Sequence, residues 1–207
     1  GFEKQEKGDN YGAISDYTKA IKINPRDSGA YFNRGLAKSN SGDHHGAISD
    51  YTKAIEINPR HEKAYYNRGW DKDELKDYSG SISDYSKAIE INPRHEKAYY
   101  NRGLAKSNLG DDYGAISDYN RAIEINSMYA KAYNNRGRTK YLLGDNKGAC
   151  SDAKKAASLG NEESKRILSG SIGAEICGSS RNLFKKDGLN NISYLLNSVP
   201  REFHVVN

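Results

Sequence analysis

A period of 34 residues is the feature of this sequence that most constrains its fold. The triplet Asn-Pro-Arg occurs at 24–26, 58–60 and 92–94, each copy 34 residues after the one before it. The longer segment AIEINPRHEKAYYNRG occurs without change at 54–69 and 88–103. A word of this length does not repeat by chance. It predicts an array of stacked structural units, in which each unit contacts its neighbours and no single large core exists.

Each unit is predicted to be a pair of helices. In the unit at 62–95, apolar residues at spacings of three and four extend from Ala64 to Leu75 and again from Ile82 to Ile91, which is typical of amphipathic helices. Pro93 then stops the second helix, because proline cannot continue the helical hydrogen-bond ladder. In the other units a turn glycine is expected to end the first helix. These glycines are Gly8, Gly42, Gly110 and Gly144.

Three further residue types recur where the two helices of a unit should meet. Small residues are predicted to face each other where the helices cross, as in Gly35 with Ala47. A tyrosine of the second helix, such as Tyr51, is large enough to wedge between successive units. An arginine and an aspartate also recur in every unit, so we expect them to pair as part of the architecture. The pairs would be Arg34–Asp50, Arg68–Asp84, Arg102–Asp118 and Arg136–Asp152.

This combination of period and residue pattern resembles the tetratricopeptide repeat family. The resemblance covers residues 1 to about 160. Three positions depart from the family's pattern: Ser81 replaces the usual alanine, Ser127 the proline and Ala153 the aromatic residue. It implies an all-α fold, a right-handed superhelical solenoid of antiparallel helix pairs. It also implies that the first helix of each unit lines the inner wall.

The period divides the chain into an array, a cap and a tail. The array has about four full repeats, and its first unit is expected to be truncated because Gly1 falls where a crossing glycine belongs. A polar-faced helix should cap the array, since a bare last unit would expose its stacking face. The segment SGSIGAEICGSS after it is linker-like. The predicted divisions are a truncated unit at 1–27, units at 28–61, 62–95, 96–129 and 130–160, a capping helix at 161–169 and a non-repeat tail at 170–207.

The inner wall predicted from the resemblance carries lysines, asparagines and aromatic residues at spacings of three and four. Asparagine amides can satisfy the backbone of an extended peptide, lysines attract carboxylates, and aromatic side chains supply contact area. We therefore predict a peptide-binding groove. Its residues are Phe32, Asn33, Lys63, Tyr66, Asn67, Trp70, Lys97, Tyr100, Asn101, Lys131, Asn135 and Arg138.

Two alternatives qualify this groove. The asparagines could instead join neighbouring helices by hydrogen bonds. The unit at 62–95 also differs from its copies, because WDKDELKD at 70–77 contains Trp70, the one tryptophan of the chain, and several acidic residues. This stretch is either a specificity patch, with Trp70 beside Asp73 and Glu74, or sequence drift at a tolerant surface.

Composition favours a binding protein over an enzyme. The net charge is +5 and charged residues make up 29% of the chain, but both signs are interspersed, unlike the basic stripe of a nucleic-acid binder. Cys150 and Cys177 form no CxxC motif and predict neither a disulfide framework nor a zinc site. We expect no catalytic site, cofactor or metal. A membrane span and a signal peptide are also not evident, which favours a cytoplasmic location.

The sequence therefore predicts a protein–protein interaction scaffold that holds a peptide segment or helix of a partner in a concave groove. One alternative is a homo-oligomer formed by end-to-end stacking of arrays, since the truncated first unit would leave a stacking face exposed. Another is nucleic-acid binding on a mildly basic face, which the interleaved acidic residues argue against.

Overall fold

The computed structural model describes residues 1, 3–4 and 8–178, and within these residues it contains helices and no strand. The expected all-α fold is confirmed. The helices are α2 (Asn10–Ile23), α3 (Ser28–Asn40), α4 (His44–Ile57), α5 (Glu62–Glu74), α6 (Tyr78–Ile91), α7 (Glu96–Asn108), α8 (Asp112–Ile125), α9 (Ala130–Leu142), α10 (Asn146–Ser158), α11 (Glu162–Ser169) and α12 (Ser171–Ile176).

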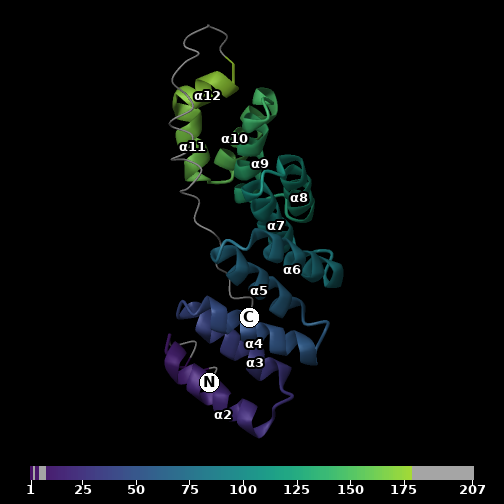
Figure 1. Cartoon of the computed structure of the whole chain (residues 1–207). Coiled ribbons are helices and arrows are strands. Elements are labelled where there is room, and N and C mark those ends of the chain that lie inside the picture. The colour runs from purple at the N-terminus through teal and green to yellow at the C-terminus, as the bar shows by residue number, and fades with distance from the viewer. Residues whose placement is uncertain (2, 5–7, 179–207) are drawn as a thin grey trace.

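The helices pack as consecutive antiparallel pairs, and the pairs stack into an elongated right-handed solenoid (Figure 1). The closest packing is within the pairs α3–α4, α5–α6, α7–α8 and α9–α10. Across pairs, α3 also contacts α5, α5 contacts α7, and α7 contacts α9. The first helices of the pairs therefore form the inner layer of the solenoid, and the second helices form the outer layer.

Local sequence sets the ends of these helices. The second helix of each pair is capped by an aspartate whose carboxylate accepts a hydrogen bond from a glycine N–H, as Asp43 does from Gly46 at 2.9 Å. The turn before it requires a left-handed residue, and Gly42 has a φ of 85° there. Lys76 occupies this position in the α5–α6 turn and has a φ of 62°, which costs a residue with a Cβ free energy that glycine avoids.

Tyrosines of the outer helices fill the space between the helices of a pair. The Tyr51 side chain is 0% exposed, and a Cβ added at Gly35 would lie only 2.8 Å from its ring. Gly103 stands in the same relation to Tyr119, at 2.7 Å. A glycine is therefore required at the crossing. Ala47 lies opposite Gly35 as the sequence predicts, but the Tyr51 ring also lies over this glycine, inside the helix pair.

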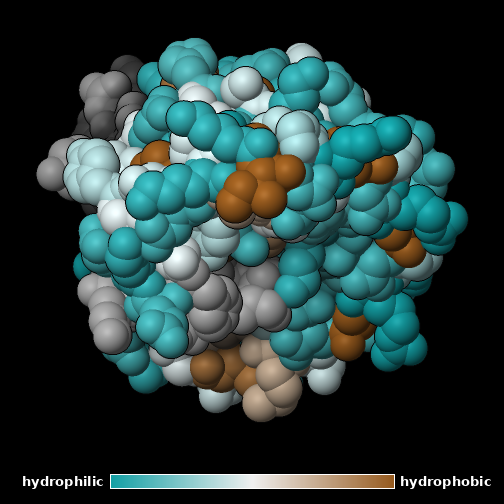
Figure 2. All heavy atoms as spheres, turned by 90° about the horizontal axis from the view of Figure 1, so that it is seen from below, coloured by the Kyte–Doolittle hydropathy of each residue, from teal (hydrophilic) through white to brown (hydrophobic). Residues whose placement is uncertain are grey.

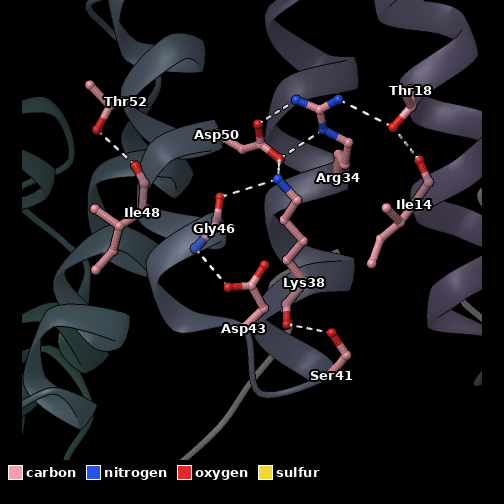
Figure 3. Close-up of polar contacts among 10 residues, drawn as sticks. All are labelled: Ile14, Thr18, Arg34, Lys38, Ser41, Asp43, Gly46, Ile48, Asp50 and Thr52. Carbon is pink, nitrogen blue, oxygen red and sulfur yellow. Dashed lines mark hydrogen bonds and ion pairs between the residues drawn. The ribbon is translucent and has the colours of Figure 1, made fainter.

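The repeated arginines and aspartates pair in every unit, which confirms the structural role expected for them. Figure 3 shows the first of these pairs, Arg34 with Asp50. In the α3–α4 pair, the Arg34 guanidinium donates to both carboxylate oxygens of Asp50, at 2.8 and 2.6 Å. Lys38 lies 2.8 Å from the same carboxylate, and Arg34 also reaches the Thr18 hydroxyl of the preceding unit at 3.2 Å. The Arg34 guanidinium thus links α3 to both α4 and α2, and two cations balance the charge of the buried Asp50 carboxylate.

The C-terminal end of the described chain departs from the sequence prediction in two ways. The segment expected to be a linker forms α12, whose Ile172 and Ile176 pack with Ala153 of α10. Cys150 and Cys177, which were not expected to pair, form a disulfide that joins α10 to the end of α12. Disulfides persist mainly in oxidising compartments, so this pairing does not support the favoured cytoplasmic location.

Candidate functional site: the inner face of the array

The first helices α3, α5, α7 and α9 present equivalent residues along the inner layer. At the second position of three of them lie Lys63, Lys97 and Lys131, all half-buried. Two turns further on lie Trp70, Leu104 and Arg138, also half-buried. These two rows give the inner face a line of cations beside a line of larger side chains with apolar surface.

Three predicted groove residues are core residues instead. Tyr66 and Tyr100 are almost completely buried, and Phe32 is 8% exposed. Each ring packs on the tyrosine of its own unit and on the ring that precedes the next first helix, as Tyr66 does on Tyr85 and His95. The prediction that Phe32, Tyr66 and Tyr100 form the exposed wall is therefore wrong, because stacking of the next unit covers them.

The asparagines follow the structural alternative. Asn101 donates from Nδ2 to the Tyr66 hydroxyl at 3.0 Å, and Asn135 donates to the Tyr100 hydroxyl at 2.7 Å. Both asparagines are buried, so they join consecutive units and offer no amide hydrogen to a peptide at these contacts. Asn67 occupies the same position one unit earlier, where the residue equivalent to Tyr66 and Tyr100 is Phe32, which has no hydroxyl. Its buried Nδ2 has no hydrogen-bond partner among the described residues.

Of the remaining predicted groove residues, Asn33 is half-buried on α3, in the same register as Asn67. The predicted acidic patch around Trp70 is only partly at the surface. Glu74 is exposed, but Asp73 is buried and so cannot act as an exposed neighbour of Trp70. The half-buried Trp70 ring lies 5.8 Å from the His44 ring.

Asp71, next to Trp70, is completely buried. Its Oδ1 accepts from the Ser39 hydroxyl at 2.8 Å and lies 2.6 Å from Nδ1 of His44. Burial raises the pKa of the Asp71 carboxyl to about 6, and the contacts with His44 and Ser39 oppose that rise. Sequence reasoning missed this cluster, although the same position holds alanine in the units of α3 and α7.

Within the described ranges, no three His, Cys, Asp or Glu residues are grouped so that they could hold a metal ion. None of the helices there is long and apolar enough to cross a membrane.

At the end of the molecule that carries the N-terminus, hydrophobic residues are scattered among hydrophilic ones and form no continuous patch over the described atoms (Figure 2).

The sequence matches family models of the tetratricopeptide repeat. One model, described as Tetratricopeptide repeat, matches residues 28–61. A second, described as TPR repeat, matches residues 74–110 and 108–144. The chain belongs to the tetratricopeptide repeat family. Residues 62–73, which include Trp70 and Asp71, lie outside these matches.

Solved structures of similar fold agree with this assignment. A crystal structure of MamA is 27% identical in sequence, with a TM-score of 0.75 over 79% of this chain and 95% of that one. YrrB, described as a TPR protein with an unusual peptide-binding site, is 18% identical, with a TM-score of 0.71 over 81% of this chain and 87% of that one. PilF of Pseudomonas aeruginosa is 17% identical, with a TM-score of 0.73 over 85% and 79% of the two chains. Among curated proteins, none matches the sequence.

Tetratricopeptide repeat proteins are generally scaffolds that bind other proteins or peptides. The inner face of the array carries charged residues that are not part of the repeated Arg–Asp clusters. The lysines of the Arg–Asp clusters, such as Lys72, are used within their own repeats. Lys63 and Lys97 have no ion-pair partner in the described part of the chain, so their charges are available to a ligand.

Proposed function

We propose that this chain is an interaction scaffold that binds an acidic peptide segment of a partner protein along its inner face. The observation that carries the proposal is the row of Lys63, Lys97 and Lys131, which recurs in register on α5, α7 and α9. The Arg–Asp clusters that hold the helices of each pair together do not use Lys63 or Lys97. An aligned row of cations on an inner surface favours an extended anionic partner.

The neighbouring row of Trp70, Leu104 and Arg138 supports a peptide as the ligand. These half-buried side chains can give up water when a partner covers them, and large side chains with few rotamers lose little entropy on binding. The match with YrrB, which is described as having a peptide-binding site, is compatible with this use of the fold. It does not identify the segment that this chain binds.

The proposal is tested with an array of acidic peptides and two double variants of the full chain. Lys63→Glu with Lys97→Glu reverses two charges on the inner layer. The control, Lys53→Glu with Lys87→Glu, changes the net charge equally on the outer helices, where both lysines are exposed. Trp70 is the one tryptophan of the chain, so its fluorescence reports ligand binding on the inner face.

We expect the inner variant to lose binding of the peptides that the unmodified chain binds, and the outer variant to keep it. The proposal would be rejected if the two variants lost affinity equally, because bulk charge would then explain binding. Retention of binding by the inner variant would also reject it. Preferential binding of single-stranded RNA with a steep salt dependence would instead favour the nucleic-acid alternative.

A further inference from the structure

The fourth helix pair, α9–α10, lacks two aromatic rings that each of the three preceding pairs contains. In those pairs an aromatic residue of the inner helix packs on a tyrosine of the outer helix, with ring centroids 5.8, 5.7 and 6.0 Å apart. The three aromatic pairs are Phe32–Tyr51, Tyr66–Tyr85 and Tyr100–Tyr119. In α9 and α10 the same positions hold Asn134 and Ala153.

A cavity lies where these rings are missing. It is lined on the repeat side by Asn134, Gly137, Ala149 and Ala153, and it has a volume of about 570 Å³ when its open mouth is included. At Gly137 an added Cβ would meet the Cβ of Asp152 at 3.0 Å and no tyrosine ring, in contrast to the other crossing glycines. The cavity is thus the space that a ring pair fills elsewhere in the array.

The other side of the cavity belongs to the cap. Ile167 of α11 and Ile172 and Ile176 of α12 line it with aliphatic side chains. These isoleucines pack with Ala149 and Ala153, yet the space between them stays open to the surface. An apolar lining of this kind favours an apolar group as its occupant.

Two charged side chains at this cavity keep buried polar atoms without partners among the residues that the structure describes. They are Nη1 of Arg138 and Oε1 of Glu163, and both residues line the cavity. Glu163 is held in place because its Oε2 accepts from Nδ2 of Asn134 at 2.8 Å. Ser164 in turn donates to Oδ1 of Asn134 at 2.6 Å. A fixed acceptor and a buried donor without partners mark a place where a ligand can complete the hydrogen bonding.

We propose that this cavity is a specificity pocket for one large apolar side chain, such as phenylalanine, followed by an acidic residue in a bound peptide. The ring fills the space of the missing aromatic pair. The acidic side chain pairs with Nη1 of Arg138, and a backbone N–H of the peptide donates to Oε1 of Glu163. Arg138 ends the inner row of Trp70 and Leu104, so the pocket lies at one end of the proposed peptide path. The inference rests on the proposed function. It names the chemistry that would hold the bound peptide at the α9–α12 end of the array.

The test uses three capped peptides, SGFDGS, SGADGS and SGFKGS, with the full chain. Binding is followed by NMR of the isoleucine methyl groups, of which Ile167, Ile172 and Ile176 report on the pocket. We expect SGFDGS to shift these methyl signals and to bind about tenfold or more tightly than either other peptide, because each of those lacks one of the two anchors.

Two variants separate pocket binding from the rest of the face. Ala153→Tyr restores the tyrosine that the other repeats have and should fill the pocket, which abolishes the shifts. Arg138→Gln leaves the cavity open and should remove the preference for SGFDGS over SGFKGS. Circular dichroism checks that each variant is folded. If Ala153→Tyr does not fold, Arg138→Gln still tests the proposal.

The outcomes distinguish this inference from the proposed function. If the acidic peptides selected by the unmodified chain still require Lys63 and Lys97 but bind Ala153→Tyr unchanged, the pocket inference is wrong and the function stands. Equal binding of SGFDGS and SGADGS would also overturn the pocket. If the lysine variant keeps full binding while SGFDGS occupies the pocket, the inner-face path is wrong and the pocket is a separate site.

Discussion

Replacing Phe32 with tyrosine should stabilise the fold by completing a hydrogen bond that two later units already have. Tyr66 and Tyr100 accept from Asn101 and Asn135 of the following unit. Phe32 has no hydroxyl, and Nδ2 of Asn67 is buried without a partner in the described part of the chain. A tyrosine already occupies the equivalent position in the next two units, so the chain itself shows that this side chain fits there.

The geometry predicts where the new hydroxyl would lie. The Phe32 ring is 4.8 Å from the His61 ring, and the Tyr66 ring is 4.7 Å from the His95 ring, with interplanar angles of 34° and 30°. A hydroxyl on the Phe32 ring should therefore reach Asn67 at about the 3.0 Å seen between Tyr66 and Asn101. A net hydrogen bond contributes about 0.5–1.5 kcal/mol, and an unpaired buried group costs about 1–3 kcal/mol. We expect a gain of about 1–2 kcal/mol in the free energy of unfolding.

Urea unfolding followed by circular dichroism measures this gain as a shift of the midpoint at constant slope. The variant Tyr66→Phe is the matched control, because it should lose a similar amount by leaving Asn101 without its acceptor. In an Asn67→Ala background, Phe32→Tyr should gain nothing, which isolates the pair. The reasoning fails if Phe32→Tyr does not raise the unfolding free energy, or if the gain survives in the Asn67→Ala background.

Three further predictions concern stability. Lys76→Gly should stabilise the chain by about 1 kcal/mol in urea unfolding, because glycine adopts its left-handed φ of 62° without steric cost; a loss of stability would contradict this. Burial raises the folded-state pKa of Asp71 from 3.8 to about 6, so its contribution to stability is fully present below pH 3.8 and is lost as the pH rises through about 6. Between pH 4 and 7 the unmodified chain should therefore lose up to about 3 kcal/mol of unfolding free energy that Asp71→Ala does not lose. Urea unfolding at the two pH values measures this, and an equal change in unfolding free energy for the two proteins would refute it. Replacing Cys150 and Cys177 with alanine should cost about 3–4 kcal/mol on the loop-closure estimate and should increase hydrogen exchange in α12, while unchanged protection there would count against a stabilising disulfide.

The sequence predicts the array well because its period places equivalent residues in equivalent surroundings. Each Arg–Asp pair lies within one unit, 16 residues apart, so one pairing rule applies to every copy. Glycine and tyrosine at the crossing likewise interact inside a unit. Contacts of this kind depend only on helix geometry and the turn between two helices, and both are encoded locally.

The inner face was harder to predict because its burial depends on how successive units stack. Asn101 meets Tyr66 across 35 residues, and the extent to which one unit covers the next follows from the twist of the solenoid. Helical spacing alone places Tyr66 and Trp70 on the same side of α5, yet Tyr66 is almost completely buried and Trp70 is half-buried. The segment after the capping helix was predicted to be a linker for another reason. Glycine and serine around 170–180 obscured the spacing of four between Ile172 and Ile176 that indicates a helix.

In a repeat protein, each residue that departs from the repeat pattern can be compared with the equivalent residues of the other units. The departures in this chain differ in how much they change the packing. Loss of one hydroxyl at Phe32 leaves the packing intact. Loss of both rings at Asn134 and Ala153 leaves a pocket that is open to the surface, and its apolar lining stays in contact with water unless a ligand covers it. In the middle of the array both faces of a unit pack on neighbours. At its end, α11 and α12 can line such a space without closing it. The last repeat is therefore where an array can exchange its own aromatic pair for a side chain supplied by a partner.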